Sequence, residues 1–172
     1  TVTGVQTCAL PISIQPGGGG MECAVGLALD AVGNPVITGY FQGTGTFGNQ
    51  TIGGYGGEEM YVAKYTASGA KVWAQAASSS DTDRGEAVTV DGAGNTYVAG
   101  YSLGASLSFF TAFTLNRPSG WYINPYLAKF DANGNFRWAV TTANVFFPWD
   151  LTPAGTNGVC LTGNPFTRSE EH

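Results

Sequence analysis

Three carboxylates lie close together in the stretch DTDRGE at residues 81–86, where Asp81, Asp83 and Glu86 could act as metal ligands. Carboxylate oxygens at short spacing suit Ca²⁺. The stretch is not an EF-hand loop, because the third acid and the distal glutamate of that motif are missing. A solvated acidic turn is the simpler interpretation. We therefore keep these three residues as a candidate Ca²⁺ site and expect no other cofactor.

A second stretch, LGASLSFFTAFTLNRPSGWYINP at residues 103–125, gathers residue types that bind glycans and proteins at surfaces. Its candidate ligand-binding residues are Phe109, Phe110, Phe113, Arg117, Trp121 and Tyr122. Aromatic rings bury large areas in cores as well as in binding sites. The alternative is that these rings cap the edge of a sheet and contact no ligand, and the sequence leaves both possibilities open.

The two ends of the chain differ in character from the region between them. The chain opens with TVTGVQTCALPIS and closes with RSEEH. Back-translated, residues 2–12 and 168–172 can both be encoded by one sequencing-library adapter read on its two strands. We expect residues 1–12 and 168–172 to be adapter-derived and non-native, and we exclude both segments from reasoning about the fold.

The remaining region lacks the residue on which much hydrolytic and metal chemistry depends. The chain has one histidine, His172, and it lies in the excluded end. Residues 13–167 therefore cannot build a Ser-His-Asp or Cys-His nucleophile, or a His-ligated zinc or haem site. We expect no enzymatic activity. The whole chain has a net charge of −5 at pH 7 and no basic clusters, which argues against nucleic acid as a partner. No apolar run is long enough to span a bilayer.

An internal repeat organises residues 13–167. The stretch ALDAVGNPVITGY (28–40) matches TVDGAGNTYVAGY (89–101), and YVAKYTASGAKVWA (61–74) matches YLAKFDANGNFRWA (126–139). A third, degraded copy includes GVCLTGN (158–164). Short apolar stretches between Gly/Asn turns indicate an all-β protein. The expected strands are 24–30, 35–41, 60–65 and 71–76 in the first unit, and 86–91, 96–102, 124–130 and 136–141 in the second.

The turns that join these strands share one sequence pattern, DAVGN, DGAGN, TASGA or DANGN. An Asp or Thr at the first position can bond the backbone ahead of it, and the Gly can take a positive φ. This pattern predicts type I turns with a G1 bulge, in which Asp30, Asp91 and Asp131 are turn residues.

The full pattern resembles one repeat family. D-x-x-G-N-x-x-(V/I)-(T/A)-G-Y, a linker, and then Y-x-A-K-(Y/F)-x-x-x-G-x-x-x-W-A resembles the bacterial SBBP β-propeller repeat. The resemblance implies an all-β fold: a partial β-propeller of two four-stranded antiparallel blades plus part of a third. The expected boundaries are 13–80 for the first blade, 81–144 for the second and 145–167 for the partial third. Because a propeller closes with about four to eight blades, we expect further blades as partners and exposed apolar flanks that include Val159 and Leu161.

Some residues recur between the units without an implied catalytic role. We expect Trp73 and Trp138 to pack between blades. We expect the stems of Lys64 and Lys129 to lie on the sheet, while their ammonium groups reach water or a carbonyl. The cysteines of the repeat region, Cys23 and Cys160, are expected to be buried thiols.

The variable linkers carry whatever binding function the repeats have. Strand alternation places the second-to-third strand linkers and the blade-to-blade connections on one face, and loops on a rigid scaffold are common binding sites. In the first unit this face includes Phe47, Tyr55, Glu58 and Glu59. The leading hypothesis is a non-catalytic module of a secreted or surface bacterial protein that binds protein or glycan. The alternatives are a purely structural spacer array and the propeller domain of an extracellular enzyme, such as a polysaccharide lyase or a quinoprotein-like oxidoreductase.

Overall fold

A computed structural model describes residues 21–109, 113–142, 147–155 and 158–164. The two segments expected to be adapter-derived, 1–12 and 168–172, lie outside the described residues. All regular structure in the described ranges is β-strand, and the strands form antiparallel sheets. The expected fold class is thereby confirmed as all-β, and the arrangement is that of part of a β-propeller. Among the described residues no helix is long and apolar enough to cross a membrane.

The first sheet has the strand order β1-β2-β3-β4, with the strands β1 (Glu22–Leu29), β2 (Pro35–Phe47), β3 (Gln50–Tyr65) and β4 (Lys71–Ala77). The second sheet has the order β10-β9-β6-β5, with the strands β5 (Asp83–Val90), β6 (Thr96–Ser102), β9 (Asn124–Phe130) and β10 (Phe136–Thr141). Two hairpins complete the described structure: β7 (Ser106–Phe109) with β8 (Phe113–Asn116), and β11 (Phe147–Ala154) with β12 (Gly158–Asn164).

The turn chemistry follows the sequence prediction. Asp30 Oδ1 accepts hydrogen bonds from the backbone N–H groups of Val32 and Asn34 at 3.0 and 2.8 Å. Gly33 has a φ of 85°. The same contacts recur at Asp91 and Asp131. Because these side chains replace missing backbone partners, they fix the hairpins locally, and the prediction that the three aspartates are turn residues is confirmed.

The degraded third copy repeats an irregularity of the first two. In each inner strand pair the register shifts by one residue at the same place: between Ala24 and Gly26, between Gly85 and Ala87, and between Pro148 and Asp150. Such bulges bend a strand and increase its twist. Their recurrence shows that β11 and β12 correspond to β5 and β6, although TPAGTNG replaces the expected turn.

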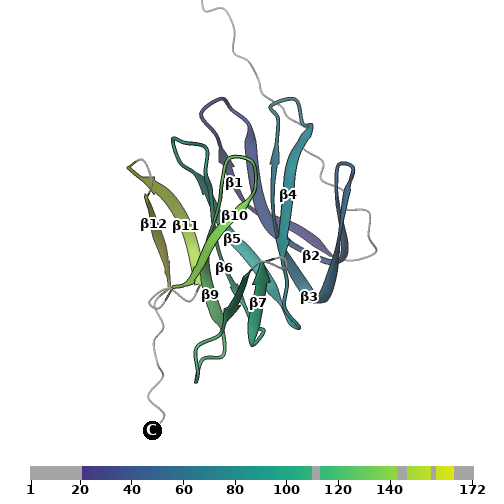
Figure 1. Cartoon of the computed structure of the whole chain (residues 1–172), viewed down its shortest axis with the longest axis vertical. Coiled ribbons are helices and arrows are strands. Elements are labelled where there is room, and N and C mark those ends of the chain that lie inside the picture. The colour runs from purple at the N-terminus through teal and green to yellow at the C-terminus, as the bar shows by residue number, and fades with distance from the viewer. Residues whose placement is uncertain (1–20, 110–112, 143–146, 156–157, 165–172) are drawn as a thin grey trace, which may run out of the picture.

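The first sheet, the second sheet and the β11–β12 hairpin stack face to face in chain order (Figure 1). Between the first and second sheets lies one apolar cluster, which includes Val36, Met60, Val62, Val88, Val98 and Tyr126. Between the second sheet and the β11–β12 hairpin lies another, which includes Ala87, Tyr97, Ala99 and Leu151. Val159 and Leu161 pack against this second cluster and are half-buried. They are therefore not the exposed flank that the sequence predicted, because they face the neighbouring sheet.

The exposed apolar surface lies elsewhere. Leu27 and Leu29 of β1 are 65% and 59% exposed, and Trp149 of β11 is 66% exposed. Leu27 and Leu29 correspond in the repeat to Val88 and Val90, which pack against the preceding sheet. These two leucines thus occupy the positions at which a further sheet would make contact.

Trp73 and Trp138 occupy equivalent positions but differ in burial. The Trp73 ring is buried and stacks on Phe130 of the next sheet, with centroids 6.4 Å apart, and its Nε1 donates to the Ala132 carbonyl at 3.2 Å. A Cβ on Gly134 would lie 2.6 Å from this indole, so the turn leaves room for it. Trp138 is 38% exposed. The prediction of packing between sheets is confirmed for Trp73 and wrong for Trp138 in the described structure.

Two further expectations need correction. Cys160 is exposed and Cys23 is half-buried, so neither thiol is fully buried. The strands β2 and β3 run well beyond the expected ends at residues 41 and 60, because the Gly-rich linker pairs with itself from Thr44↔Gly53 to Phe47↔Gln50. Phe47 is buried and lies edge-on to Phe41 at 6.0 Å, which holds the extended hairpin on its sheet.

Candidate functional site

Three connections meet at one end of the sheets and enclose a groove. They are the extended β2–β3 hairpin, the β4–β5 connection and the linker hairpin β7–β8. The second and third are joined directly: Ser78 N–H donates to the Ser108 carbonyl at 3.0 Å, and Ser108 N–H donates back at 2.9 Å. The groove has a volume of about 830 Å³. The meeting of these connections agrees with the expectation that both kinds of linker share one face.

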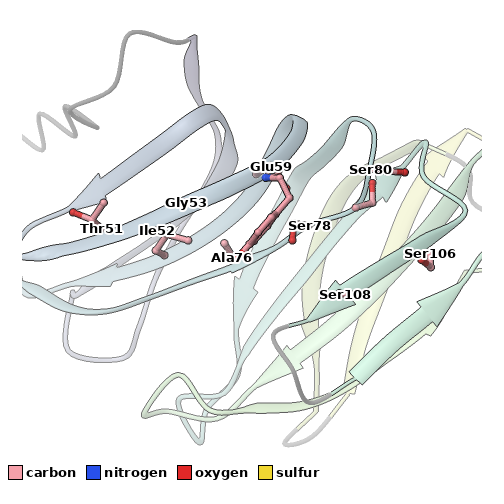
Figure 2. Close-up of a pocket in the computed structure, with 11 residues that line it drawn as sticks. Thr51, Ile52, Gly53, Glu59, Ala76, Ser78, Ser80, Ser106 and Ser108 are labelled. Carbon is pink, nitrogen blue, oxygen red and sulfur yellow. Dashed lines mark hydrogen bonds between the residues drawn. The ribbon is translucent and has the colours of Figure 1, made fainter.

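Each connection contributes one part of the lining. From β3 come Thr51, Ile52, Gly53, Tyr55 and Glu59; from β4 and the connection after it, Ala76, Ser78, Ser79 and Ser80; from β7, Ser106 and Ser108. Figure 2 shows Thr51 and Ile52 at one side, Ser80, Ser106 and Ser108 toward the other, and Ala76 and Ser78 between them. The lining combines hydroxyl groups with a few apolar surfaces.

Glycines in β3 allow its backbone to approach the β4–β5 connection. A Cβ on Gly56 would lie 2.9 Å from the Ser79 carbonyl oxygen and 3.0 Å from that of Asp81. A Cβ on Gly54 would lie 2.7 Å from Glu59 Cγ. Any larger residue at either position would have to push backbone or a buried side chain aside. The GGYGG run is therefore part of the construction of the groove.

Glu59 lies beneath this run with 1% of its surface exposed. Its Oε1 accepts hydrogen bonds from the backbone N–H groups of Tyr55 and Gly56, both at 2.6 Å. Its Oε2 is buried and has no hydrogen-bond partner among the described residues. Burial raises the pKa of the Glu59 carboxyl, although the two N–H groups act in the opposite direction. The Tyr55 side chain itself is 87% exposed, so Glu59 anchors the backbone from which an exposed ring projects.

Asp83 holds the other wall of the groove. Its carboxylate is fully buried and accepts hydrogen bonds from Ser79 N–H at 2.5 Å and from Ser79 Oγ at 2.8 Å. Burial raises the pKa of Asp83 to about 7, and the charge of nearby Glu59 acts in the same direction. The SSSD connection is thus fixed by a side chain that lies in the following strand.

The candidate Ca²⁺ ligands do not form a cluster. Asp81 is exposed and Glu86 is half-buried, and burial raises the pKa of Glu86. In the described ranges no group of three or more His, Cys, Asp or Glu side chains is placed to hold a metal ion. Both Asp83 oxygens are already used by Ser79. Ca²⁺ binding at Asp81, Asp83 and Glu86 stays an untested prediction.

The aromatic candidates divide into core and surface residues. Phe109 is fully buried, with its ring centroid 5.1 Å from that of Phe136 and 5.6 Å from that of Tyr126. It is therefore a core residue, and its expected role as a ligand contact is wrong. Phe113 is 37% exposed and stacks on Phe136 at 5.5 Å. Phe110 lies outside the described residues. The Phe109 and Phe113 rings fix the β7–β8 hairpin against the sheet through Phe136, as the capping alternative states.

Arg117 also acts within the linker. Its guanidinium Nη1 donates to the carbonyls of Leu103 and Tyr122 at 2.8 and 3.1 Å. These bonds connect the start of the linker to its end. Trp121 is half-buried and its backbone N–H donates to the Pro118 carbonyl at 3.2 Å. The Tyr122 side chain is 89% exposed. Among the described aromatic candidates in this linker, Tyr122 is the one with a fully presented ring, and it does not line the groove.

Glu58 is the other linker acid singled out by the sequence, and it joins two sheets. The Arg84 guanidinium forms a bidentate pair with it, through Nε to Oε2 and through Nη2 to Oε1, the latter at 2.8 Å. The same guanidinium lies over the Tyr40 ring at 4.3 Å from its centroid. The pKa of Arg84 is raised by its hydrogen bond to Glu58. Such a planar pair between sheets fixes their relative position.

The serines of the groove were not identified from the sequence. Ser78, Ser80, Ser106 and Ser108 lie in SSS and SLS stretches that resemble ordinary polar turns. The pairing of Ser78 with Ser108 brings the two stretches together, although they lie in different repeats. The available signal was their position in connections predicted to share one face.

Comparison with known families supports the repeat assignment for part of the chain. Residues 72–108 match the family model SBBP, described as a beta-propeller repeat. The match begins in β4 and ends in β7, so it includes the serines of the groove but neither Tyr55 nor Glu59. No curated protein matches the chain.

Proposed function

We propose that this chain is a non-catalytic, propeller-type module of a larger secreted or surface-exposed bacterial protein, and that it binds protein or glycan through its linker face. The observation that carries the proposal is the groove of about 830 Å³ that three connections form at that face. Ligand sites of about 300–1,000 Å³ are typical of proteins. The repeat family that residues 72–108 match is generally non-catalytic.

The construction of the groove supports binding rather than chemistry. Its two buried carboxylates are used to hold backbone: Glu59 bonds Tyr55 and Gly56, and Asp83 bonds Ser79. The walls belong to strands that pack on large cores, so the groove is positioned by a rigid scaffold. Loops and strand ends on such a scaffold are common sites of recognition.

Binding assays with the purified chain test the proposal. The labelled protein is screened against an array of oligosaccharides and against a panel of purified extracellular bacterial proteins. We expect saturable binding to at least one of them. If the chain shows the circular dichroism of a β-protein and binds neither class, the proposal is overturned in favour of a structural spacer array.

A further inference from the structure

We propose that the groove between β3, the β4–β5 connection and β7 is a saccharide site, and that it takes a neutral oligosaccharide with Tyr55 as its stacking platform. This inference rests on the proposed function and names its ligand class. Three features of the lining carry it: the absence of an exposed charge, the density of hydroxyl groups and one presented aromatic ring.

Within the part of the chain that the structure describes, the lining presents no charged group to a ligand. Of the residues that line the groove, Glu59 alone carries a carboxylate, and it is 1% exposed. A uronic acid or a phosphorylated ligand would enter without a counter-charge. A basic ligand would meet no exposed acid among the lining residues, since the exposed Asp81 follows Ser80 but does not line the groove. Since charges that lose water without a partner are costly, the groove favours an uncharged ligand.

Hydroxyl groups from all three connections line the groove. Those available to a ligand belong to Thr51, Ser78, Ser80, Ser106 and Ser108. Ser79 Oγ is already hydrogen-bonded to Asp83 at 2.8 Å. A hydroxyl group donates one hydrogen bond and accepts others, and the hydroxyls of a sugar have the same double capacity. A polyhydroxylated ligand can therefore satisfy these groups from several directions at once, whereas an apolar ligand would leave them unbonded.

Tyr55 supplies the flat surface that a sugar ring requires. Its side chain is 87% exposed although it lines the groove, and Ile52 lies on the same strand. The face of an aromatic ring is weakly negative, which suits the C–H groups on one face of a pyranose. A phenol also carries a polar end that can bond a neighbouring sugar hydroxyl.

Glu59 is the positioning residue for this platform. Its Oε1 holds the backbone N–H groups of Tyr55 and Gly56 at 2.6 Å, so the ring projects from a fixed backbone. A backbone that is already fixed loses less freedom when the ring binds a ligand than a mobile backbone would. A glutamine could accept the same two hydrogen bonds, whereas an alanine could not.

The experiment uses the full chain on an array that contains neutral oligosaccharides, uronate oligosaccharides and unmodified peptides, followed by calorimetry on each ligand that binds. We expect a neutral oligosaccharide to bind. Tyr55→Ala should weaken the binding of that oligosaccharide at least 10-fold, because it removes the stacking ring. The variant should stay folded, because the Tyr55 side chain is exposed. Tyr122→Ala is the matched control, because it removes an equally exposed tyrosine outside the groove, and we expect no change.

A second pair of variants separates positioning from folding. Glu59→Gln should keep the affinity within about two-fold, whereas Glu59→Ala should weaken binding to the degree seen for Tyr55→Ala. Two results would overturn the groove assignment while the proposed function stands. The first is binding of uronates or peptides only. The second is binding that survives Tyr55→Ala and is lost in Tyr122→Ala. Absence of any binding would overturn both.

Discussion

Lys64 Nζ lies 2.9 Å from Asp30 Oδ2, and the two side chains are 10% and 8% exposed. The equivalent residues of the second repeat, Lys129 and Asp91, are connected differently. Tyr97 is the residue of the second repeat that corresponds to Val36. Its hydroxyl donates to Asp91 Oδ2 at 3.1 Å. The Lys129 ammonium lies 4.8 Å from the centroid of the Tyr97 ring. The sequence prediction that Lys64 reaches water or a carbonyl is therefore wrong, because the turn aspartate is its partner.

This difference gives two matched substitutions with unequal costs. Lys64→Met leaves Asp30 without its cation, and we expect a loss of about 1–3 kcal/mol, between the values for exposed and for buried ion pairs. Lys129→Met removes a cation–π contact and should cost about 0.5–1 kcal/mol. Urea unfolding of both variants measures the difference. Equal costs would contradict the distinct roles of the two lysines.

The two equivalent tryptophans give a second comparison. Trp73→Ala removes a buried ring and its hydrogen bond to Ala132, and we expect a loss of about 3–5 kcal/mol. Trp138→Ala should cost clearly less, because that ring is already 38% exposed. Chemical unfolding gives the energies, and the fluorescence of each variant serves as an internal check. Loss of Trp73 should reduce the emission at shorter wavelength. Loss of Trp138 should reduce the emission at longer wavelength, to which the more exposed Trp149 also contributes.

These comparisons show what sequence could and could not predict. The turns at Asp30, Asp91 and Asp131 and the strands of the second repeat follow from local chemistry and from the internal repeat, so both were predictable. The extension of β2 and β3 was missed, since a Gly-rich linker carries no strand pattern until the packing of Phe47 on Phe41 holds it.

The site was less predictable than the fold. Tyr55 and Glu59 could be placed on the linker face, but the serines of the groove come together through the pairing of Ser78 with Ser108. Phe109 was misassigned because aromatic residues in a linker have the same sequence signature whether they contact a ligand or fill a core. Only its burial against Phe136 distinguishes the two.

Asp83 predicts a pH dependence of stability in the neutral range. Its pKa is about 7 in the folded protein, against an ordinary value of 3.8. Between these values the folded protein holds a proton that the unfolded chain has released, so stability falls as pH rises and levels off above pH 7. Asp83→Asn should therefore flatten the fall in melting temperature between pH 5 and pH 8 and raise stability at pH 8.

Asp81→Asn is the control for this prediction, since that carboxylate is exposed in the same connection. It should leave the pH profile of the parent chain unchanged. Residual slope in Asp83→Asn is expected from Glu59, whose pKa burial also raises. An unchanged slope in Asp83→Asn would mean that this carboxyl keeps its charge in the folded state throughout the range.

The exposed apolar positions predict self-association. Leu27 and Leu29 are 65% and 59% exposed on the outer face of the first sheet, and Trp149 is 66% exposed. Exposed apolar surface on the outer sheets favours association, and in repeat proteins each unit gains stability from its neighbours. We therefore expect the purified chain to sediment as oligomers at micromolar concentration and to unfold with low cooperativity.

Charge placed at the same positions tests the cause. Leu27→Lys combined with Leu29→Lys should shift the sedimentation profile toward monomer, because two ammonium groups on each copy would repel and would resist losing water at a contact. Val32→Lys is the matched control, since Val32 is 78% exposed but lies in the turn after β1. A parent chain that is monomeric with one sharp melt would show that the sheets are stable without further neighbours. Oligomers that persist in the double variant would place the contact on another surface, with the face around Trp149 as the next to be tested.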